Sequence, residues 1–348
     1  MDEKISESFG EIFRNYDLLK NYGDKIDYLQ SWRFSEDDLL RLFYHYFAYT
    51  KIQEYSLPGA YNFDIGSEDV FGHFLKDSCD NLKRDPENLN NFMEEFLEEF
   101  DDFVSCFKEL MKNTNKKKEV KKIFNFLGPN ANMYPLIISL KKKGWLDEEM
   151  FNILESLDVR VYKIRGTNPR ADLYKETISQ LKNGLTKTEA KENLKDFIED
   201  WMPIPQLKNN LNENIYPNPA LNYILWEYEK EKKESFDGWD YDYYKELQID
   251  HIFPQEEKIV FPGDGFEDEE EYISNKHKIG NLCLLEEDKN QQAKNKVPKK
   301  KSKFYRKSDV PGTRKIGIHI ENKGINKKYI QERTEKIRDF CVNRWSIK

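Results

Sequence analysis

The sequence predicts a mainly α-helical protein with one small strand–loop–strand–helix unit near its C-terminus. In the first two-thirds of the chain, apolar and aromatic residues recur every three or four positions, which is the spacing of one helix face. Residues 247–253 and 279–285 are short apolar segments that suit strands, and residues 286–294 are polar helix formers. We therefore expect a helical domain over residues 1–215 and a second domain over residues 216–348.

Several helices can be placed individually. The clearest apolar stripe runs from Phe92 to Leu110, and a shorter aromatic stripe covers residues 39–47. Residues 132–140 contain a proline that suits a helix start, and Thr186-x-x-Glu189 is a capping box for the helix that follows. Residues 220–229 predict a helix that docks the strand pair onto the rest of the protein. These stripes are typical of a core and do not indicate a cofactor site.

Composition excludes several classes of protein. A chain of 348 residues is long enough for two or three domains, and 14% aromatic residues indicate a globular protein despite 34% charged residues. The four cysteines are far apart without a Cys-x-x-Cys pair, which favours free thiols over disulfides or a structural zinc site. No apolar run approaches a membrane span, and the N-terminus does not resemble a signal peptide, so we expect a cytoplasmic protein.

Charge is distributed unevenly along the chain. The net charge is −8, but residues 288–348 carry 19 Lys and Arg against 6 Asp and Glu. A basic segment of this kind suits binding to a phosphate backbone, although a charge run is more commonly a solvated surface. We predict that this segment binds DNA through five side chains, which are Lys294, Lys300, Lys301, Lys303 and Arg306.

The strand–loop–strand–helix unit contains residues that suit metal-assisted hydrolysis. Asp250 and the side-chain carbonyl of Asn290 provide the oxygen ligands that Mg²⁺ or Mn²⁺ prefers. His251 can take a proton from a water that attacks phosphorus, because its ordinary pKa lies near neutral pH. Asp-His alone is common, so the prediction depends on the three elements occurring in this order.

These residues resemble the HNH, or ββα-metal, nucleases. The longer strings Asp-His-Ile-Phe-Pro-Gln (250–255) and Ile-Gly-Asn-Leu-Cys-Leu-Leu (279–285) resemble the C-terminal HNH half of GmrSD-type modification-dependent restriction enzymes. The resemblance implies that His251 is the general base, that Asn281 steadies the hairpin, and that Asp250 and Asn290 bind the metal. Asn295 is a second candidate on the helix, ranked below Asn290. The third motif position is asparagine rather than histidine, which puts the strength of the metal site in doubt.

Two further features of this region have ordinary explanations. Asp264 and Glu267 to Glu271 could be mistaken for metal ligands, but six acids in eight residues more commonly form a solvated loop or helix start. His277 lies four residues before Asn281 and either flanks the phosphate or is simply exposed.

The resemblance also bears on partners and on the alternatives. The chain contains no P-loop and no Asp-Gly-Gln-Gln-Arg-like signature, so it looks like the nuclease half alone. The resemblance then implies a separate subunit for nucleotide hydrolysis and modified-base recognition, although the C-terminal part of a longer protein would look the same. The expected function is a metal-dependent DNA endonuclease in defence against foreign or modified DNA. The alternatives are a catalytically weak or inactive helical adaptor that binds nucleic acid or a partner, and an HNH ribonuclease or nickase.

Overall fold

The computed structural model describes residues 36–50, 70–113, 117–182, 184–231, 240–256 and 260–347. Helices dominate these residues, and the only strands among them form one pair, so the predicted mainly α fold is confirmed. The chain divides into two compact units, each built from separate segments. Unit 1 comprises residues up to Lys112, Asn130–Leu146 and Pro169–Ala190, and unit 2 comprises Asn113–Pro129, Asp147–Asn168 and Lys191–Lys348. The predicted boundary at residue 215 stays a prediction.

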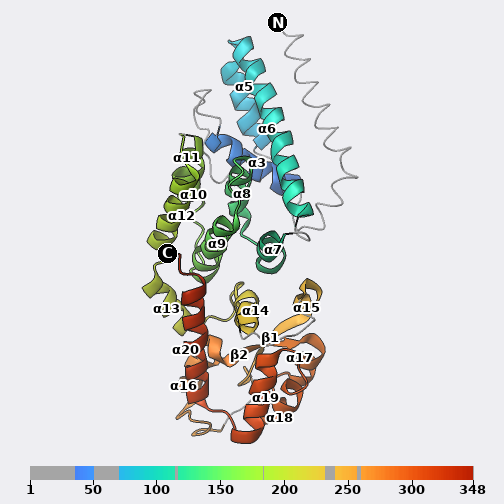
Figure 1. Cartoon of the computed structure of the whole chain (residues 1–348), viewed down its shortest axis with the longest axis vertical. Coiled ribbons are helices and arrows are strands. Elements are labelled where there is room, and N and C mark those ends of the chain that lie inside the picture. Colours follow the sequence, from blue (N-terminus) through green and yellow to red (C-terminus); the bar gives the residue numbers. More distant parts are fainter. Residues whose placement is uncertain are drawn as a thin grey trace. The chain divides into compact units, whose positions relative to one another are not determined.

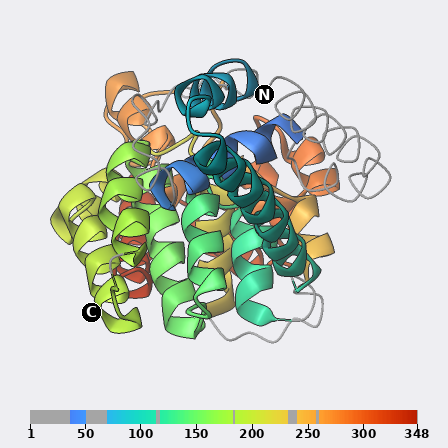
Figure 2. The same ribbon diagram turned by 90° about the horizontal axis from the view of Figure 1, so that it is seen from above.

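Unit 1 is helical throughout its described part. Two of its helices, α3 and α6, cross each other (Figures 1 and 2). Its elements are α3 (Glu36–Thr50), η2 (Val70–Leu75), α5 (Lys76–Leu82), α6 (Pro86–Lys112), η4 (Ala131–Met133), α8 (Tyr134–Lys142), α10 (Arg170–Leu173), η6 (Tyr174–Ile178), α11 (Ser179–Lys182) and the start of α12 (Lys187–Trp201).

Aromatic packing holds unit 1 together. The ring of Phe43 on α3 lies edge-on to Phe96 and Phe100 on α6, with centroids 5.0 and 4.9 Å apart. Edge-to-face contacts of this kind stabilise a core beyond the area they bury. Of the predicted α6 stripe, every member except the half-buried Phe100 is fully buried. The aromatic stripes are therefore core, as predicted.

Unit 2 contains the strand pair and the remaining helices. Its elements are α7 (Lys118–Lys121), η3 (Lys122–Leu127), α9 (Glu148–Leu157), η5 (Asp158–Ile164), most of α12, α13 (Ile204–Asn212), α14 (Leu221–Glu231), α15 (Tyr241–Glu246), β1 (Leu247–His251), α16 (Glu269–Lys276), η7 (Ile279–Asn281), β2 (Leu282–Glu286), α17 (Glu287–Ala293), α18 (Pro298–Tyr305), α19 (Pro311–Lys323) and α20 (Lys327–Arg344).

Strands β1 and β2 form an antiparallel hairpin that pairs Asp250 with Cys283 and His251 with Leu282. Helix α17 follows β2 directly, so the predicted order of strand, loop, strand and helix is confirmed. The hairpin contacts α14, α17 and α19 (Figure 1). The predicted docking helix over residues 220–229 is thus α14. Between the strands, the acidic insert begins helix α16, with Asp268 as its N-cap. Of the two expectations for these acids, a solvated loop or a helix start, the helix start is therefore confirmed.

Local sequence signals explain two of these helices. At the start of α12, the backbone N–H of Thr186 donates to Glu189 at 2.8 Å and the Glu189 N–H donates to the Thr186 hydroxyl at 3.3 Å. This reciprocal pair is the predicted capping box. Pro135 lies in the first turn of α8, where its missing N–H costs nothing. No described helix is both long and apolar enough to cross a bilayer.

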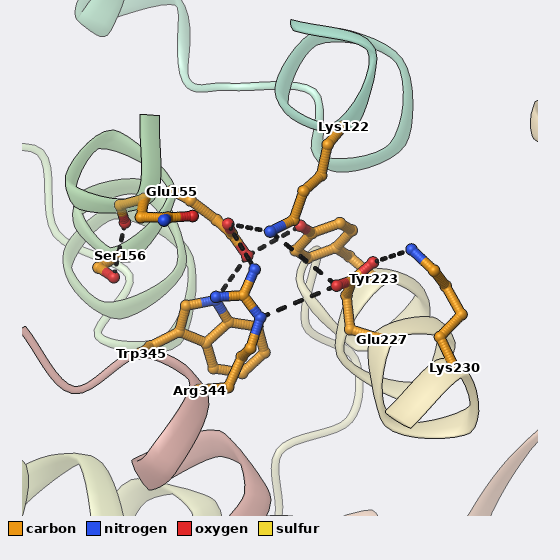
Figure 3. A network of polar contacts seen from close by, with 9 residues as sticks. Lys122, Glu155, Ser156, Tyr223, Glu227, Lys230, Arg344 and Trp345 are labelled. Atoms are coloured by element: carbon orange, nitrogen blue, oxygen red, sulfur yellow. Dashed lines mark hydrogen bonds and ion pairs between the residues drawn. The ribbon is translucent and has the colours of Figure 1, made fainter. Parts of the chain in front are cut away.

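A buried carboxylate joins three segments of unit 2 (Figure 3). Glu155 on α9 accepts hydrogen bonds from Tyr223 on α14, from Arg344 and from the Trp345 indole, each at 2.9 Å, and it pairs with Lys122 on η3. Burial raises the pKa of Glu155. Because a buried charge is costly without partners, this set of donors is what allows the carboxylate to lie in the core.

Removing this carboxylate leaves Lys122 and Arg344 with only the more distant Glu227 carboxylate, at 4.0 and 3.9 Å, as a shared counter-ion. We expect Glu155→Ala to lower the free energy of unfolding by about 3–5 kcal/mol, measured by urea denaturation. The control is Glu332→Ala on α20, which loses only an exposed pair with Lys328 and is expected to change stability by less than about 0.5 kcal/mol. Equal effects of the two substitutions would show that the buried set is not a stabilising interaction.

Candidate active site on the hairpin

Neighbouring residues of a strand point to opposite faces, and this separates the two motif residues of β1. The Asp250 carboxylate accepts hydrogen bonds from Lys301 and Tyr305 on α18. The His251 ring instead contacts His277, which follows α16, and Gln255 in the loop after β1. The Asp250 carboxylate and the His251 imidazole therefore belong to two separate clusters of hydrogen-bonded side chains.

The His251 ring has a hydrogen-bond partner at each nitrogen. Nδ1 lies 2.8 Å from Nε2 of Gln255, and Nε2 lies 3.1 Å from Nδ1 of His277. With the Gln255 amide in this orientation, its nitrogen donates to Nδ1 of His251, and this assigns the proton of the neutral ring to Nε2. That proton is donated to Nδ1 of His277. The basic nitrogen of His251 is therefore Nδ1, and the Gln255 amide covers it.

Burial keeps the His251 ring neutral. Only 4% of the residue is exposed, and desolvation lowers its pKa to about 3, with the nearby His277, Lys301 and Lys276 acting in the same direction. Burial also lowers the pKa of His277, together with Lys276. A neutral imidazole with an unprotonated Nδ1 has the protonation state of a general base, but a pKa of about 3 makes it a weaker base than the ordinary histidine expected from the sequence.

The second motif residue, Asn281, joins the two ends of the insert. Its amide nitrogen donates to the carbonyls of Phe253 at 3.1 Å and Lys276 at 2.7 Å, and its amide oxygen accepts the Phe253 N–H at 2.8 Å. The loop after His251 and the end of α16 before His277 are thereby fixed to one side chain. Asn281 lies where its predicted supporting role requires it, and that role stays a prediction.

Helix α20 holds the two residues that precede Asn281, Ile279 and Gly280. The buried Arg333 guanidinium donates to the carbonyls of Ile279 at 3.2 Å and Gly280 at 2.8 Å, and the Gly280 N–H donates to Thr334 at 3.2 Å. A Cβ at position 280 would lie 2.1 Å from the Ile330 carbonyl oxygen. The glycine of the Ile-Gly-Asn string is therefore required by this close approach of η7 to α20.

Asp250 is paired inside the protein. The ammonium of Lys301 lies 2.7 and 3.0 Å from the two carboxylate oxygens of Asp250, and it also donates to the His251 carbonyl at 2.5 Å. Tyr305 donates to the same carboxylate. Only 1% of Lys301 is exposed, and in this arrangement its charge neutralises a buried acid instead of facing a DNA backbone.

The predicted metal ligands do not form one site in this arrangement. Three of the roughly four acceptor positions of the Asp250 carboxylate are taken by Lys301 and Tyr305. Asn290 on α17 donates from its amide nitrogen to Gln248 at 2.9 Å, which leaves its carbonyl oxygen as the donor atom that suits a hard cation. As the side chains stand, Asn290 offers one oxygen that could bind a divalent metal, whereas Lys301 and Tyr305 occupy the Asp250 carboxylate. Among the described residues, no group of three or more His, Cys, Asp and Glu is arranged to hold a metal ion.

The other predicted DNA-binding residues are on the surface of α17 and α18. Lys294, Lys300, Lys303 and Arg306 are exposed, and the ammonium of Lys303 lies 4.9 Å from the ring centroid of Phe304. Arg306 pairs with Glu321 on α19, which offsets part of its charge. The lower-ranked Asn295 is also exposed and donates to Glu256 at 2.8 Å.

Three residues at this site were not singled out from the sequence, namely Tyr216, Gln255 and Tyr305. Tyr305 lies four residues after Lys301 on α18, so helical spacing places both on one face and is a usable signal. Gln255 belongs to the Asp-His-Ile-Phe-Pro-Gln string, but nothing in that string indicates a contact with Nδ1. Tyr216 is distant in sequence, and no local pattern could have identified it.

The hairpin, the following helix and the buried histidine lie in a part of the chain that is similar to a family of restriction endonucleases. More particularly, residues 191–340 match the family model of the GmrSD restriction endonucleases, C-terminal domain. These residues contain β1, β2, α17 and α18, and the match confirms the resemblance predicted from the motif strings. No curated protein matches the chain.

The burial of His251 predicts how it responds to pH. The folded pKa is about 3 and the ordinary value is 6.5, so the unfolded chain takes up the proton first, and acid below pH 6.5 favours unfolding. In a ¹⁵N-histidine NMR titration, we expect the His251 ring signals to stay at their neutral positions from pH 7.5 to 5.0. A midpoint near 6.5 would show that the ring is not buried in solution.

The ion pair of Asp250 is testable by a double-mutant cycle. We expect Lys301→Met to lower the free energy of unfolding by about 3–5 kcal/mol, because Asp250 remains buried without its counter-ion. The double variant Asp250→Asn, Lys301→Met should lose much less than the sum of the single effects. The matched control is Lys300→Met, one residue earlier and exposed, with an expected change below about 0.5 kcal/mol. Additive single effects would contradict the pairing.

Proposed function

We propose that the part of the chain around residues 191–340 is a metal-dependent HNH endonuclease that hydrolyses DNA phosphodiesters in defence against foreign or modified DNA. The observation that carries the proposal is His251, a buried and neutral histidine on the hairpin of a GmrSD-type C-terminal domain, with Nδ1 as its basic nitrogen. Burial and a fixed tautomer are what distinguish it from an ordinary surface histidine.

His251 would act as the general base. A water bound near Nδ1 gives its proton to that nitrogen while its oxygen attacks phosphorus, and the bond from phosphorus to the leaving oxygen breaks. The Gln255 amide occupies Nδ1 in this structure, so substrate or water must displace it. Gln255 is half-buried in a loop, where a side-chain rotation is enough to move it.

The divalent metal is proposed on the family resemblance and on the amide oxygen of Asn290. A bound Mg²⁺ or Mn²⁺ would stabilise the charge on the scissile phosphate and the leaving oxygen. Asp250 would join Asn290 as a ligand only after Lys301 had left its carboxylate. Lys294, Lys300 and Lys303 are exposed and would contact the phosphate backbone without reading sequence.

A partner is also part of the proposal. The chain lacks a P-loop, and the GmrSD resemblance implies nucleotide hydrolysis and modified-base recognition. We propose that a separate subunit supplies these functions and delivers DNA to the hairpin.

One observation favours a second function. Lys301 already neutralises the charge of Asp250, so this carboxylate does not need a metal ion as its counter-ion. A domain of this kind could bind DNA or a partner subunit without cutting, as a helical adaptor.

Cleavage of plasmid DNA with Mg²⁺ or Mn²⁺ separates the two functions. The endonuclease proposal expects His251→Ala to lower the cleavage rate by about 10²- to 10⁴-fold, which is the usual contribution of a general base. His319→Ala on α19 is the matched control and should leave the rate unchanged. Cleavage that persists in His251→Ala at the wild-type rate would exclude His251 as the base. DNA binding without cleavage in the wild type would instead support the adaptor.

A further inference from the structure

The His277 ring is held on three sides. Its Nδ1 faces Nε2 of His251, and its ring stacks on Tyr216 with centroids 5.6 Å apart and an interplanar angle of 13°. Its backbone carbonyl accepts the N–H groups of Ile215 at 3.1 Å and Tyr216 at 3.4 Å. The segment before α14 therefore fixes both the backbone and the ring of His277.

Tyr216 also contacts His251. The two rings meet edge-on, with centroids 4.6 Å apart and an interplanar angle of 83°. The tyrosine ring thus lies against both imidazoles and leaves them in one relative orientation. Its contact with His251 is a ring contact, so among the described residues the hydrogen bond to His277 is the interaction of Nε2 that depends on the position of the proton.

This geometry leaves His277 little capacity to bind a phosphate through Nδ1. That nitrogen accepts the His251 proton, so it carries no proton of its own to donate to a phosphate oxygen. The predicted alternatives for His277 were a phosphate contact and simple exposure. The ring is half-buried and stacked on an aromatic residue rather than simply exposed, and a phosphate contact through Nε2 stays a prediction.

We propose that His277 is a positioning residue, which holds the ring proton of His251 on Nε2 after the Gln255 amide has left Nδ1, so that Nδ1 is unprotonated and can accept a proton from water. This inference rests on the proposed function, because it concerns the same base. Neutral histidine otherwise distributes its proton between two tautomers, and a base in the wrong tautomer is inactive although its position is correct. Tyr216 contributes by fixing the His277 ring.

Three variants of the full chain test the proposal. His277→Ala removes the acceptor, and His277→Phe keeps an aromatic ring for Tyr216 but also removes the acceptor. His277→Asn is the conservative variant, because its side-chain oxygen can replace Nδ1 as the acceptor. The chain has only five histidines, so ¹⁵N-histidine labelling resolves the tautomer of each ring by NMR. Cleavage kinetics are measured on the same samples, and circular dichroism verifies folding.

We expect wild-type His251 to be protonated on Nε2. In the Ala and Phe variants the Gln255 amide can turn its carbonyl oxygen toward a protonated Nδ1, so a mixture of tautomers is expected. In these two variants kcat should fall by about 10- to 100-fold with little change in KM, as is usual when an orienting partner is lost. His277→Asn should restore the Nε2 tautomer and most of kcat.

Two results would overturn the positioning role. The first is a His251 tautomer that is the same in folded His277→Ala as in the wild type. The second is a rise in KM with kcat unchanged, which would indicate a phosphate contact. If His277→Ala alters the tautomer but wild-type protein cuts no DNA under any metal, the positioning role is supported and the proposed nuclease function fails. The two proposals are thus tested separately.

Discussion

The alternation of side chains along β1 is the constraint on which the arrangement of the site depends. Because Asp250 and His251 are consecutive, a strand must direct them to opposite faces of the hairpin. On one face, Lys301 and Tyr305 attach α18 to the carboxylate. On the other face, His277 and Gln255 enclose the imidazole. The ammonium of Lys301 joins the two faces, since it also binds the backbone carbonyl of His251.

The insert between the strands has a structural purpose in this arrangement. It carries Gln255 at its beginning and His277 near its end, and Asn281 ties the two ends together through Phe253 and Lys276. A hairpin with a short turn could not place two side chains from separate segments against one imidazole. The length of the insert therefore follows from the need to surround His251, whereas its acids serve mainly to start α16.

Much of this fold could be predicted because its signals are local. Helical spacing identified the α6 stripe, the Thr186 and Glu189 pair identified the start of α12, and the two motif strings identified the hairpin and its family. The composition of residues 288–348 could not distinguish Lys301 from Lys300, although one is buried and the other exposed. Burial of a lysine depends on which acid lies opposite it, and that acid is 51 positions away.

The site was predictable only in part for the same reason. A motif shows which residues are present, but it does not show which other residues of the protein already form ion pairs or hydrogen bonds with them. Asp250 has the residue type of a metal ligand, yet the fold gives it an internal cation as partner. Tyr216 approaches His251 from a segment whose sequence carries no catalytic signal. Contacts between distant segments decided both outcomes.

The carboxylate of Glu155 has a consequence for the order in which the protein assembles. Its indole partner, Trp345, is 190 positions later in the chain. During synthesis on the ribosome, Lys122 and later Tyr223 are available to Glu155 before Arg344 and Trp345 have been made. The full set of donors around this buried carboxylate therefore forms only when the last residues of the chain reach α9.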